Sequence, residues 1–248
     1  SIHLENKNDK KALREAKRFI KQINLPSNPD EILLDEVNNK AYVTSPSAST
    51  IFVIDLNTMS LAQKIKINGY CENLLLKEDK LFYVDKLKNE IWAIELKNQY
   101  ELKDIGIFPN VSSLAFTNNK LYISSRTKSR IAIIDYSTMG LITEFTTVNK
   151  PLAMLLYDKT LYVLGAQNNE IQKINTANDQ VIDTIALGTE GFSSGLNAIE
   201  NTNLAVVTDL KNNLYSILDL SKGKLLKTYK LNVPIKSVII TNKVSLFD

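Results

Sequence analysis

The feature that most constrains this chain is a segment that returns at a regular interval of about 40 residues, within the range of periods that marks repeat architectures. Lys120-Leu-Tyr-Ile-Ser124 has counterparts one interval earlier at Lys80–Val84, two intervals earlier at Lys40–Thr44, and one interval later at Thr160–Leu164. We assign two further copies, one after a slip of three residues at Asn203–Val207 and one at Lys243–Phe247. A fixed period of this length predicts a repeat protein.

Each repeat contains four short apolar segments separated by turn residues. The segment Ile51-Phe-Val-Ile-Asp55 recurs at Ile91, Ile131, Ile171 and Tyr215, and looser apolar runs precede and follow each pair. Asp55, Asp135 and Asp219 open Asx-type turns. The chain has 26 asparagines but only 8 glycines, so we expect asparagine to replace glycine as the main turn residue. Four strands in about 40 residues form one blade of a β-propeller.

The chain length of 248 residues holds six such units. The expected fold is therefore all-β, a six-bladed β-propeller with four antiparallel strands per blade. The sixth copy stops after its second strand, so we expect both termini to close the last blade and hide its strand edges. Residues 1–28 would supply a strand and a short helix at 10–18. The pattern of residues 19–24 fits a helix or a strand, so their conformation is left open. Residues 29–248 would form the propeller domain. A fragment of a larger protein is the alternative.

The chain resembles the YVTN-repeat β-propellers, which are related to the NHL and lactonase-like propellers. The resemblance rests on Tyr42-Val-Thr-Ser45, Tyr122-Ile-Ser-Ser125, Tyr162-Val163 and Val206-Val-Thr-Asp209, with Pro151 and Pro234 opening first strands. The resemblance covers about residues 29–248. No repeat of this chain has the glycine that is usual in the family between the first two strands. Because members of that family are mostly bacterial or archaeal and often exported, the resemblance implies an extracytoplasmic location, periplasmic or secreted.

Composition excludes several kinds of chemistry. One cysteine, Cys71, and one histidine, His3, rule out an intrachain disulfide and clustered Cys or His metal ligands. The net charge of +3 and the lack of aromatic residues among the charged loops argue against a nucleic-acid partner. No apolar run is long enough to indicate a transmembrane helix. We expect Cys71 to be an unreactive thiol, and Trp92, Tyr42, Tyr122 and Tyr162 to pack inside or between blades.

Candidate binding residues lie in loops at one end of the blades. The fourth-to-first and second-to-third connections share that end, and they supply the residues expected to contact a partner: Tyr70, Asn110, Arg126, Lys128, Arg130, Lys150, Glu190, Phe192 and Ser193. Phe192 lies in Gly188–Gly195, where we place the three extra residues of the slip. Its alternative role is to plug the channel mouth.

The sequence shows no set of an acid, a base and a nucleophile of the kind that forms a catalytic site. The leading hypothesis is a non-catalytic scaffold, monomeric in isolation and without a cofactor, that binds a protein or an acidic surface polymer. The alternative is a metal-dependent hydrolase or lyase of the lactonase-like type, with oxygen ligands from Glu31, Glu72, Asn73 and Asn110.

Overall fold

The computed structural model describes residues 22–117, 119–188, 193–199 and 201–232, and these form five four-stranded antiparallel sheets. The first contains β1 (Ile32–Asp35), β2 (Lys40–Ser45), β3 (Thr50–Asp55) and β4 (Ser60–Lys66), with the short 3-10 helix η1 (Pro46–Ala48) after β2. The second contains β5 (Cys71–Lys77), β6 (Lys80–Asp85), β7 (Glu90–Glu95) and β8 (Glu101–Ile107). The third contains β9 (Val111–Thr117), β10 (Lys120–Ser125), β11 (Arg130–Asp135) and β12 (Leu141–Thr146).

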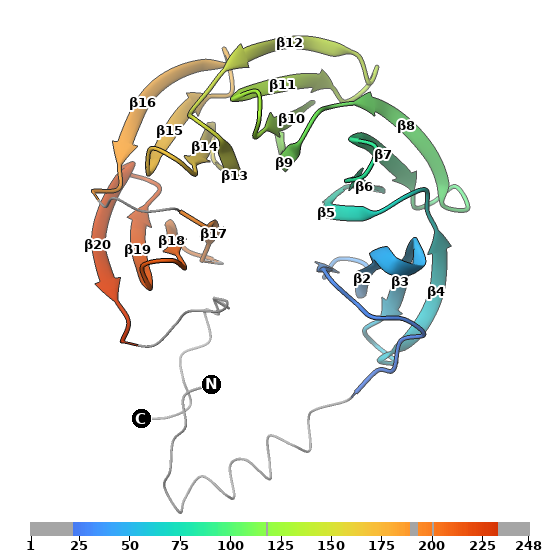
Figure 1. The fold of residues 1–248 in the computed structure, drawn as a ribbon. Coiled ribbons are helices and arrows are strands. Elements are labelled where there is room, and N and C mark those ends of the chain that lie inside the picture. The colour runs from blue at the N-terminus through green and yellow to red at the C-terminus, as the bar shows by residue number, and fades with distance from the viewer. Residues whose placement is uncertain (1–21, 118, 189–192, 200, 233–248) are drawn as a thin grey trace, which may run out of the picture.

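The last two sheets follow the same order. The fourth contains β13 (Pro151–Tyr157), β14 (Thr160–Gly165), β15 (Glu170–Asn175) and β16 (Gln180–Ala186), and the fifth contains β17 (Gly195–Ala198), β18 (Leu204–Asp209), β19 (Leu214–Asp219) and β20 (Lys224–Lys230). The first strand of a sheet lies innermost and the fourth outermost, and inner strands β1, β5, β9, β13 and β17 contact one another in that order (Figure 1). The fold is a β-propeller.

The sequence predicted six blades, and the described residues form five sheets. The sixth repeat, 233–248, the N-terminal strand and the helix at 10–18 lie outside the described residues. Of residues 19–24, which the sequence left undecided between helix and strand, the structure describes 22–24, and these have neither conformation. Among the described residues, η1 is the one helical segment.

Apolar side chains pack between successive sheets. Tyr42, Tyr122 and Tyr162 are at most 1% exposed and lie in these inter-sheet clusters, which confirms their predicted place in the core. Trp92 packs against the cluster that contains Tyr42, as the sequence also predicted. Val206 takes the position of these tyrosines in the fifth sheet, because it is the third residue of β18 as Tyr162 is the third residue of β14.

The slip in the repeat is therefore larger than the sequence suggested, and it is divided between two places. Met154 pairs with Val163 and Leu196 pairs with Val207. From Met154 to Leu196, on the inner strands, the interval exceeds the 40-residue repeat by two positions. From Val163 to Val207, on the second strands, it exceeds the repeat by four. Two extra residues precede β17, and two more lie in the turn before Leu204, whose carbonyl accepts a hydrogen bond from the Ile199 amide. The sequence placed all the extra residues before β17, because the run Leu204-Ala-Val-Val207 is apolar throughout and fits either register.

Turn chemistry follows the sequence closely. The carboxylates of Asp55, Asp135 and Asp219 accept hydrogen bonds from backbone N–H groups three residues later. The backbone bond lowers the pKa of Asp55, whereas at Asp135 and Asp219 the hydroxyl groups of Ser137 and Ser221 lower the pKa most and the backbone bonds add to the effect. Asparagines take left-handed backbone conformations at several turn positions, namely Asn39, Asn89, Asn110, Asn169, Asn201 and Asn213. Asn and Asp tolerate this conformation better than other residues with a side chain, so the low glycine content does not limit the fold.

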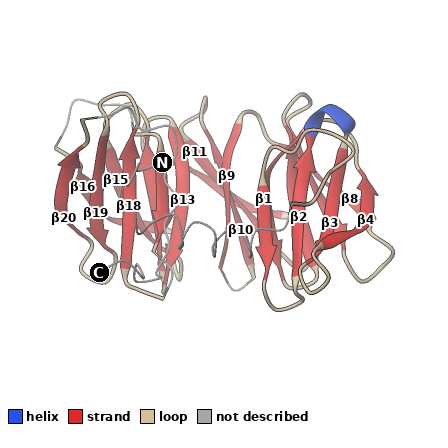
Figure 2. Ribbon diagram, turned by 90° about the horizontal axis from the view of Figure 1, so that it is seen from below, coloured by secondary structure: helices blue, strands red, loops and turns tan. Residues whose placement is uncertain are grey.

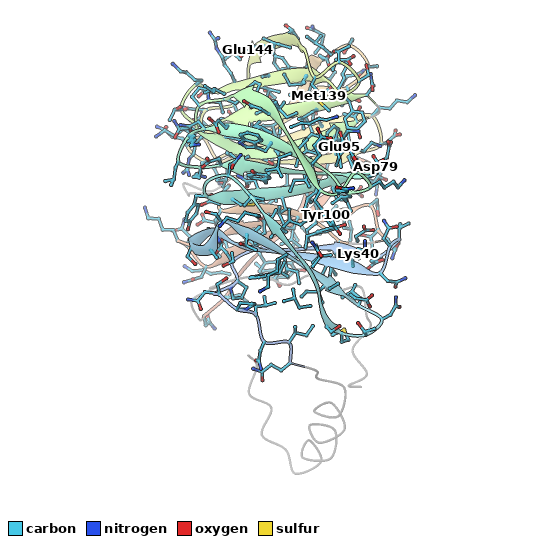
Figure 3. All side chains as sticks on the ribbon, turned by 90° about the vertical axis from the view of Figure 1, so that its right-hand side faces the viewer. Lys40, Asp79, Glu95, Tyr100, Met139 and Glu144 are labelled. Carbon is cyan, nitrogen blue, oxygen red and sulfur yellow. The ribbon has the colours of Figure 1, made fainter. Side chains whose placement is uncertain are left out.

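The two ends of the sheets differ in their connections. We call the end that carries η1 and the second-to-third connections the loop end (Figure 2). The fourth-to-first connections lie there too, because each begins with a backbone hydrogen bond to the second-to-third connection of the same sheet. The donor and acceptor pairs are Ile67 to Ser49, Phe108 to Asn89, Thr147 to Ser129 and Leu187 to Asn169. The opposite end, here called the turn end, carries Lys40, Asp79, Glu95, Tyr100 and Met139, which follow one another along one side of the molecule (Figure 3).

Candidate functional site

Three of the predicted binding residues occupy the same position in consecutive sheets. Tyr70, Asn110 and Lys150 each precede an inner strand at the loop end. Their carbonyl groups accept hydrogen bonds from the backbone N–H groups of Lys86, Arg126 and Ala166 at 2.9, 3.0 and 3.0 Å. The bonds fix each connection against the neighbouring hairpin, so these side chains stand at defined places around the loop end.

The third sheet gathers most of the predicted cations. Its second-to-third connection, Arg126–Ser129, is the basic loop. Asn110 holds one side of it through the Arg126 amide, and Lys150 holds the other, because its own amide donates to the Ser129 hydroxyl at 3.2 Å. Arg126, Lys128 and Lys150 are exposed. In the part of the chain that the structure describes, none of the three forms an ion pair.

A cavity of about 360 Å³ opens beside the basic loop. Phe108 and Pro109 form the wall on the side of the second sheet, and the third sheet supplies Ile123, Ser125, Thr127, Lys128, Arg130, Ala132 and Glu144. The Ser125 hydroxyl donates to the Pro109 carbonyl at 2.6 Å and so fixes one wall to the other. The size falls at the lower end of the range of about 300–1,000 Å³ typical of ligand pockets. We call this cavity the third-sheet pocket.

Charge in the third-sheet pocket is only partly balanced. Arg130 Nη1 lies 3.3 Å from Glu144 Oε2, and both side chains are about half exposed. Lys128 lines the same cavity without an ionic partner among the described residues. The lining therefore keeps a net positive charge next to the apolar side chains of Phe108, Ile123 and Ala132.

The inserted connection before β17 is described only at its ends. Glu190 and Phe192, which the sequence proposed as partner contacts, lie outside the described residues. Ser193 is 4% exposed, and its hydroxyl donates a hydrogen bond to the Asn169 side chain, so this side chain forms a contact within the protein. The neighbouring Ser194 hydroxyl bonds to the Thr208 carbonyl and to the Leu210 amide.

Two of the four proposed metal ligands, Glu31 and Glu72, have partners within the protein. Both carboxylate oxygens of Glu31 lie 3.2 Å from the Leu74 amide, and burial raises the pKa of this carboxyl group. Glu72 is 2.9 Å from Lys86 Nζ, and Asn110 is exposed in a separate connection. Within the described ranges, no three His, Cys, Asp or Glu side chains are placed to hold a metal. The alternative metal site of Glu31, Glu72, Asn73 and Asn110 therefore stays a prediction.

One detail of that alternative also changes. The 40-residue period places Glu31 in the same repeat position as Cys71. The strand register instead aligns Glu31 with Ser113, since Ile32 pairs with Val43 as Leu114 pairs with Ile123. Ser113 makes the equivalent contact, accepting a hydrogen bond from the Met154 amide at 3.1 Å. Glu31 thus links the first sheet to the second, as Ser113 links the third to the fourth.

Cys71 is fully buried, and burial, with the nearby carboxylate of Glu31, strongly raises the pKa of its thiol. A thiol in this state is a poor nucleophile. Sequence reasoning proposed Lys128 and Arg130 of the third-sheet pocket and missed its other lining residues, Phe108, Pro109, Ile123, Ser125, Thr127, Ala132 and Glu144. Only Ala132 gave a signal, because it is small where Phe52 and Trp92 stand in the first two repeats.

Comparison with known proteins agrees with the fold. No protein-family model matches this sequence, and no curated protein does so either. Virginiamycin B lyase from Staphylococcus aureus is similar in structure, with a TM-score of 0.69 and 18% identity over 85% of this chain and 72% of that chain. KlHsv2 with loop 6CD replaced by a Gly-Ser linker has a TM-score of 0.69 and 13% identity, over 86% of this chain and 71% of that one.

A third similar structure is the dihydro-heme d1 dehydrogenase NirN, with a TM-score of 0.64 and 13% identity over 82% of this chain. The chain spans 48% of the length of NirN, about half. Two of these neighbours, the lyase and NirN, are β-propellers of the lactonase or NHL kind, whereas membership of the YVTN-repeat family stays a prediction. Likeness at this level of identity establishes the fold and not the activity. A search of the described residues found no helix with the length and apolar character needed to cross a membrane.

Proposed function

We propose that this chain is a non-catalytic β-propeller scaffold that binds an acidic protein through its loop end. The observation that carries the proposal is the cluster of Arg126, Lys128 and Lys150 around the basic loop, without ionic partners among the described residues. An acidic surface polymer is the other occupant considered, and the third-sheet pocket beside the cluster favours a protein, because a local cavity suits a single anchoring group. The extracytoplasmic location and the monomeric state stay predictions.

Unpaired cations on a rigid scaffold suit this task. Charges at the rim of an interface steer a partner of opposite sign and raise its association rate more than its affinity. The sheets beneath hold the loop in place through the Asn110, Ser129 and Lys150 contacts. A partner therefore meets a positive surface whose shape is set before binding.

Neutralising the cluster should abolish partner binding. In the full chain, Arg126→Ala, Lys128→Ala and Lys150→Ala together should reduce retention of the partner from an extract of the source cells at least tenfold, measured by quantitative mass spectrometry on immobilised protein. The matched control removes three lysines of the turn end, Lys97→Ala, Lys159→Ala and Lys222→Ala, and should retain the partner like the wild type.

Three results would count against the proposal. Equal retention by the loop-end variant would show that the cluster is not the binding surface. Retention that survives protease treatment but not polysaccharide digestion would assign the surface to a polymer. A stoichiometric divalent ion, with a Ca²⁺-dependent rise of several degrees in melting temperature, would favour the hydrolase or lyase alternative.

We also propose that residues 233–248, together with the N-terminal segment, form a sixth sheet between the fifth and the first. Support comes from the first sheet, where Ala41, Val43, Phe52 and Ile54 form an apolar face with Ile23 and Leu25. In the second to fifth sheets the equivalent face packs against the preceding sheet. An apolar cavity of about 400 Å³ lies at this face of the first sheet, next to Ile32, which is 63% exposed.

Closure makes a prediction for Val244, which occupies the repeat position of Ala41, Leu81, Leu121, Leu161 and Ala205. These five residues are 0–1% exposed. Val244→Asp should therefore lower the melting temperature by more than about 10 °C, because burying an unpaired carboxylate costs several kcal/mol. Val37→Asp, at a position 92% exposed, serves as the control. Equal melting temperatures for the two variants would place residue 244 outside the propeller.

A further inference from the structure

The third-sheet pocket exists because one repeat position holds a small side chain. The position is Phe52, Trp92, Ala132, Gln172 and Ser216 in sheets one to five, on the face that meets the preceding sheet. Phe52 is 2% exposed, and Trp92 packs against the first sheet. Ala132 has a single methyl group, and the third-sheet pocket of about 360 Å³ lies over it.

The other small or polar residues at this position have different surroundings. Gln172 extends to Thr147, whose hydroxyl donates to Gln172 Oε1 at 2.8 Å. At Ser216 the remaining cavity is only about 10 Å³, and Leu187 and Ser193 from the inserted connection line it. The third sheet has a small residue at this position and a connection of ordinary length, so nothing else in the described chain occupies the space.

The chemistry of the walls defines what fits. Phe108, Ile123 and Ala132 give the pocket an apolar lining. Aromatic side chains, Phe52 and Trp92, occupy the position of Ala132 in the first two repeats, so the space suits a planar ring. Lys128 presents an unpaired ammonium at the rim. Arg130 contacts Glu144 through Nη1, and a guanidinium has five N–H donors, so donors remain for a second carboxylate.

Glu144 narrows the choice of anion. Its carboxylate lies on the pocket wall, so a ligand group of charge −2, such as a phosphate, would be repelled more than a carboxylate of charge −1. We propose that the third-sheet pocket binds an aromatic ring that bears a nearby carboxylate, with the ring over Ala132 and the carboxylate between Lys128 and Arg130. The inference rests on the proposed function, because it specifies the anchor that a loop-end partner would use.

Two sources present this chemistry: the carboxy-terminal aromatic residue of a polypeptide, and a free aromatic acid. Isothermal titration of the full chain with two probes separates them. One is the peptide acetyl-Gly-Ser-Gly-Ser-Trp with a free carboxylate, and the other is N-acetyl-L-tryptophan. Tighter binding of the peptide by tenfold or more identifies the polypeptide source, and equal binding identifies the free acid. Each result supports the proposed chemistry.

The controls change one property at a time. The carboxamide forms of both probes should bind at least tenfold more weakly, and so should the free acids to the variant Lys128→Ala with Arg130→Ala. Ala132→Trp, which installs the residue of the preceding repeat, should fill the pocket and weaken binding at least tenfold with all charges intact. Ala132→Phe serves the same purpose if the tryptophan variant fails to fold by circular dichroism.

Several outcomes would overturn the inference. These are no binding to the wild type at millimolar probe, equal binding of acid and amide, and undiminished binding to a folded Ala132 variant. The partner-retention experiment distinguishes this failure from failure of the proposed function. If the charge variant loses the partner but Ala132→Trp keeps it, the loop end remains the binding surface and the pocket is not its anchor.

Discussion

Tyr122→Ala is expected to lower the free energy of unfolding by about 3–5 kcal/mol, as truncation of a buried aromatic side chain usually does. Tyr122 is fully buried between the third and fourth sheets. Its hydroxyl donates to Asp179, whose other carboxylate oxygen lies 2.6 Å from Lys120 Nζ. Removing the side chain would leave a cavity between two sheets and would remove one partner of the partly buried Asp179 carboxylate. Urea denaturation of the full chain measures the change.

Tyr122→Phe separates the ring from the hydroxyl. Burial, with the nearby Asp179 carboxylate, raises the pKa of the tyrosine, so the hydroxyl stays protonated and acts as a donor. Loss of that donor alone should cost about 1–3 kcal/mol, because the acceptor is charged. If the phenylalanine variant lost as much stability as the alanine variant, packing of the ring would not be the main contribution.

Gly69→Ala should destabilise the protein by at least about 3 kcal/mol, the sum expected for left-handed backbone strain and for overpacking. Gly69 has a φ of +75°, and a Cβ atom there would lie 1.8 Å from Asp85 Oδ2. The Asp85 side chain cannot move away at low cost, since it is fully buried and its Oδ1 accepts hydrogen bonds from the Tyr70 and Leu87 amides. Thermal and urea denaturation would both report the loss.

Gly188→Ala provides the matched control for Gly69→Ala. Gly188 has a φ of +70°, and a Cβ atom there would meet nothing within 4 Å. The control should therefore cost only the backbone strain of about 1–2 kcal/mol. Equal losses for the two variants would mean that the close approach of Gly69 to Asp85 adds nothing to the effect.

Local sequence determined the repeating part of this protein. Each strand pairs within its own hairpin or with the next strand along the chain, and turns formed by Asp and Asn set the spacing, so a single repeat contains nearly all the information for one sheet. The buried tyrosines Tyr42, Tyr122 and Tyr162 followed from the same pattern. The basic loop also followed, because the residues between two predicted strands must lie at the end of the sheet.

Tertiary structure decided the features that depend on contacts between sheets. The register of β18 could not be read from the sequence, because a shift of one residue at Leu204 leaves apolar residues on both faces. The apolar face around Phe52 and Ile54 has the same residue types whether or not another sheet covers it. The third-sheet pocket depends on what fills the space beside Ala132, and that space is bounded by Phe108 from the connection leaving the second sheet. The sequence determined the sheets and their loop residues through local pairing, whereas cavities and shared contacts arose only from the packing of one sheet against the next.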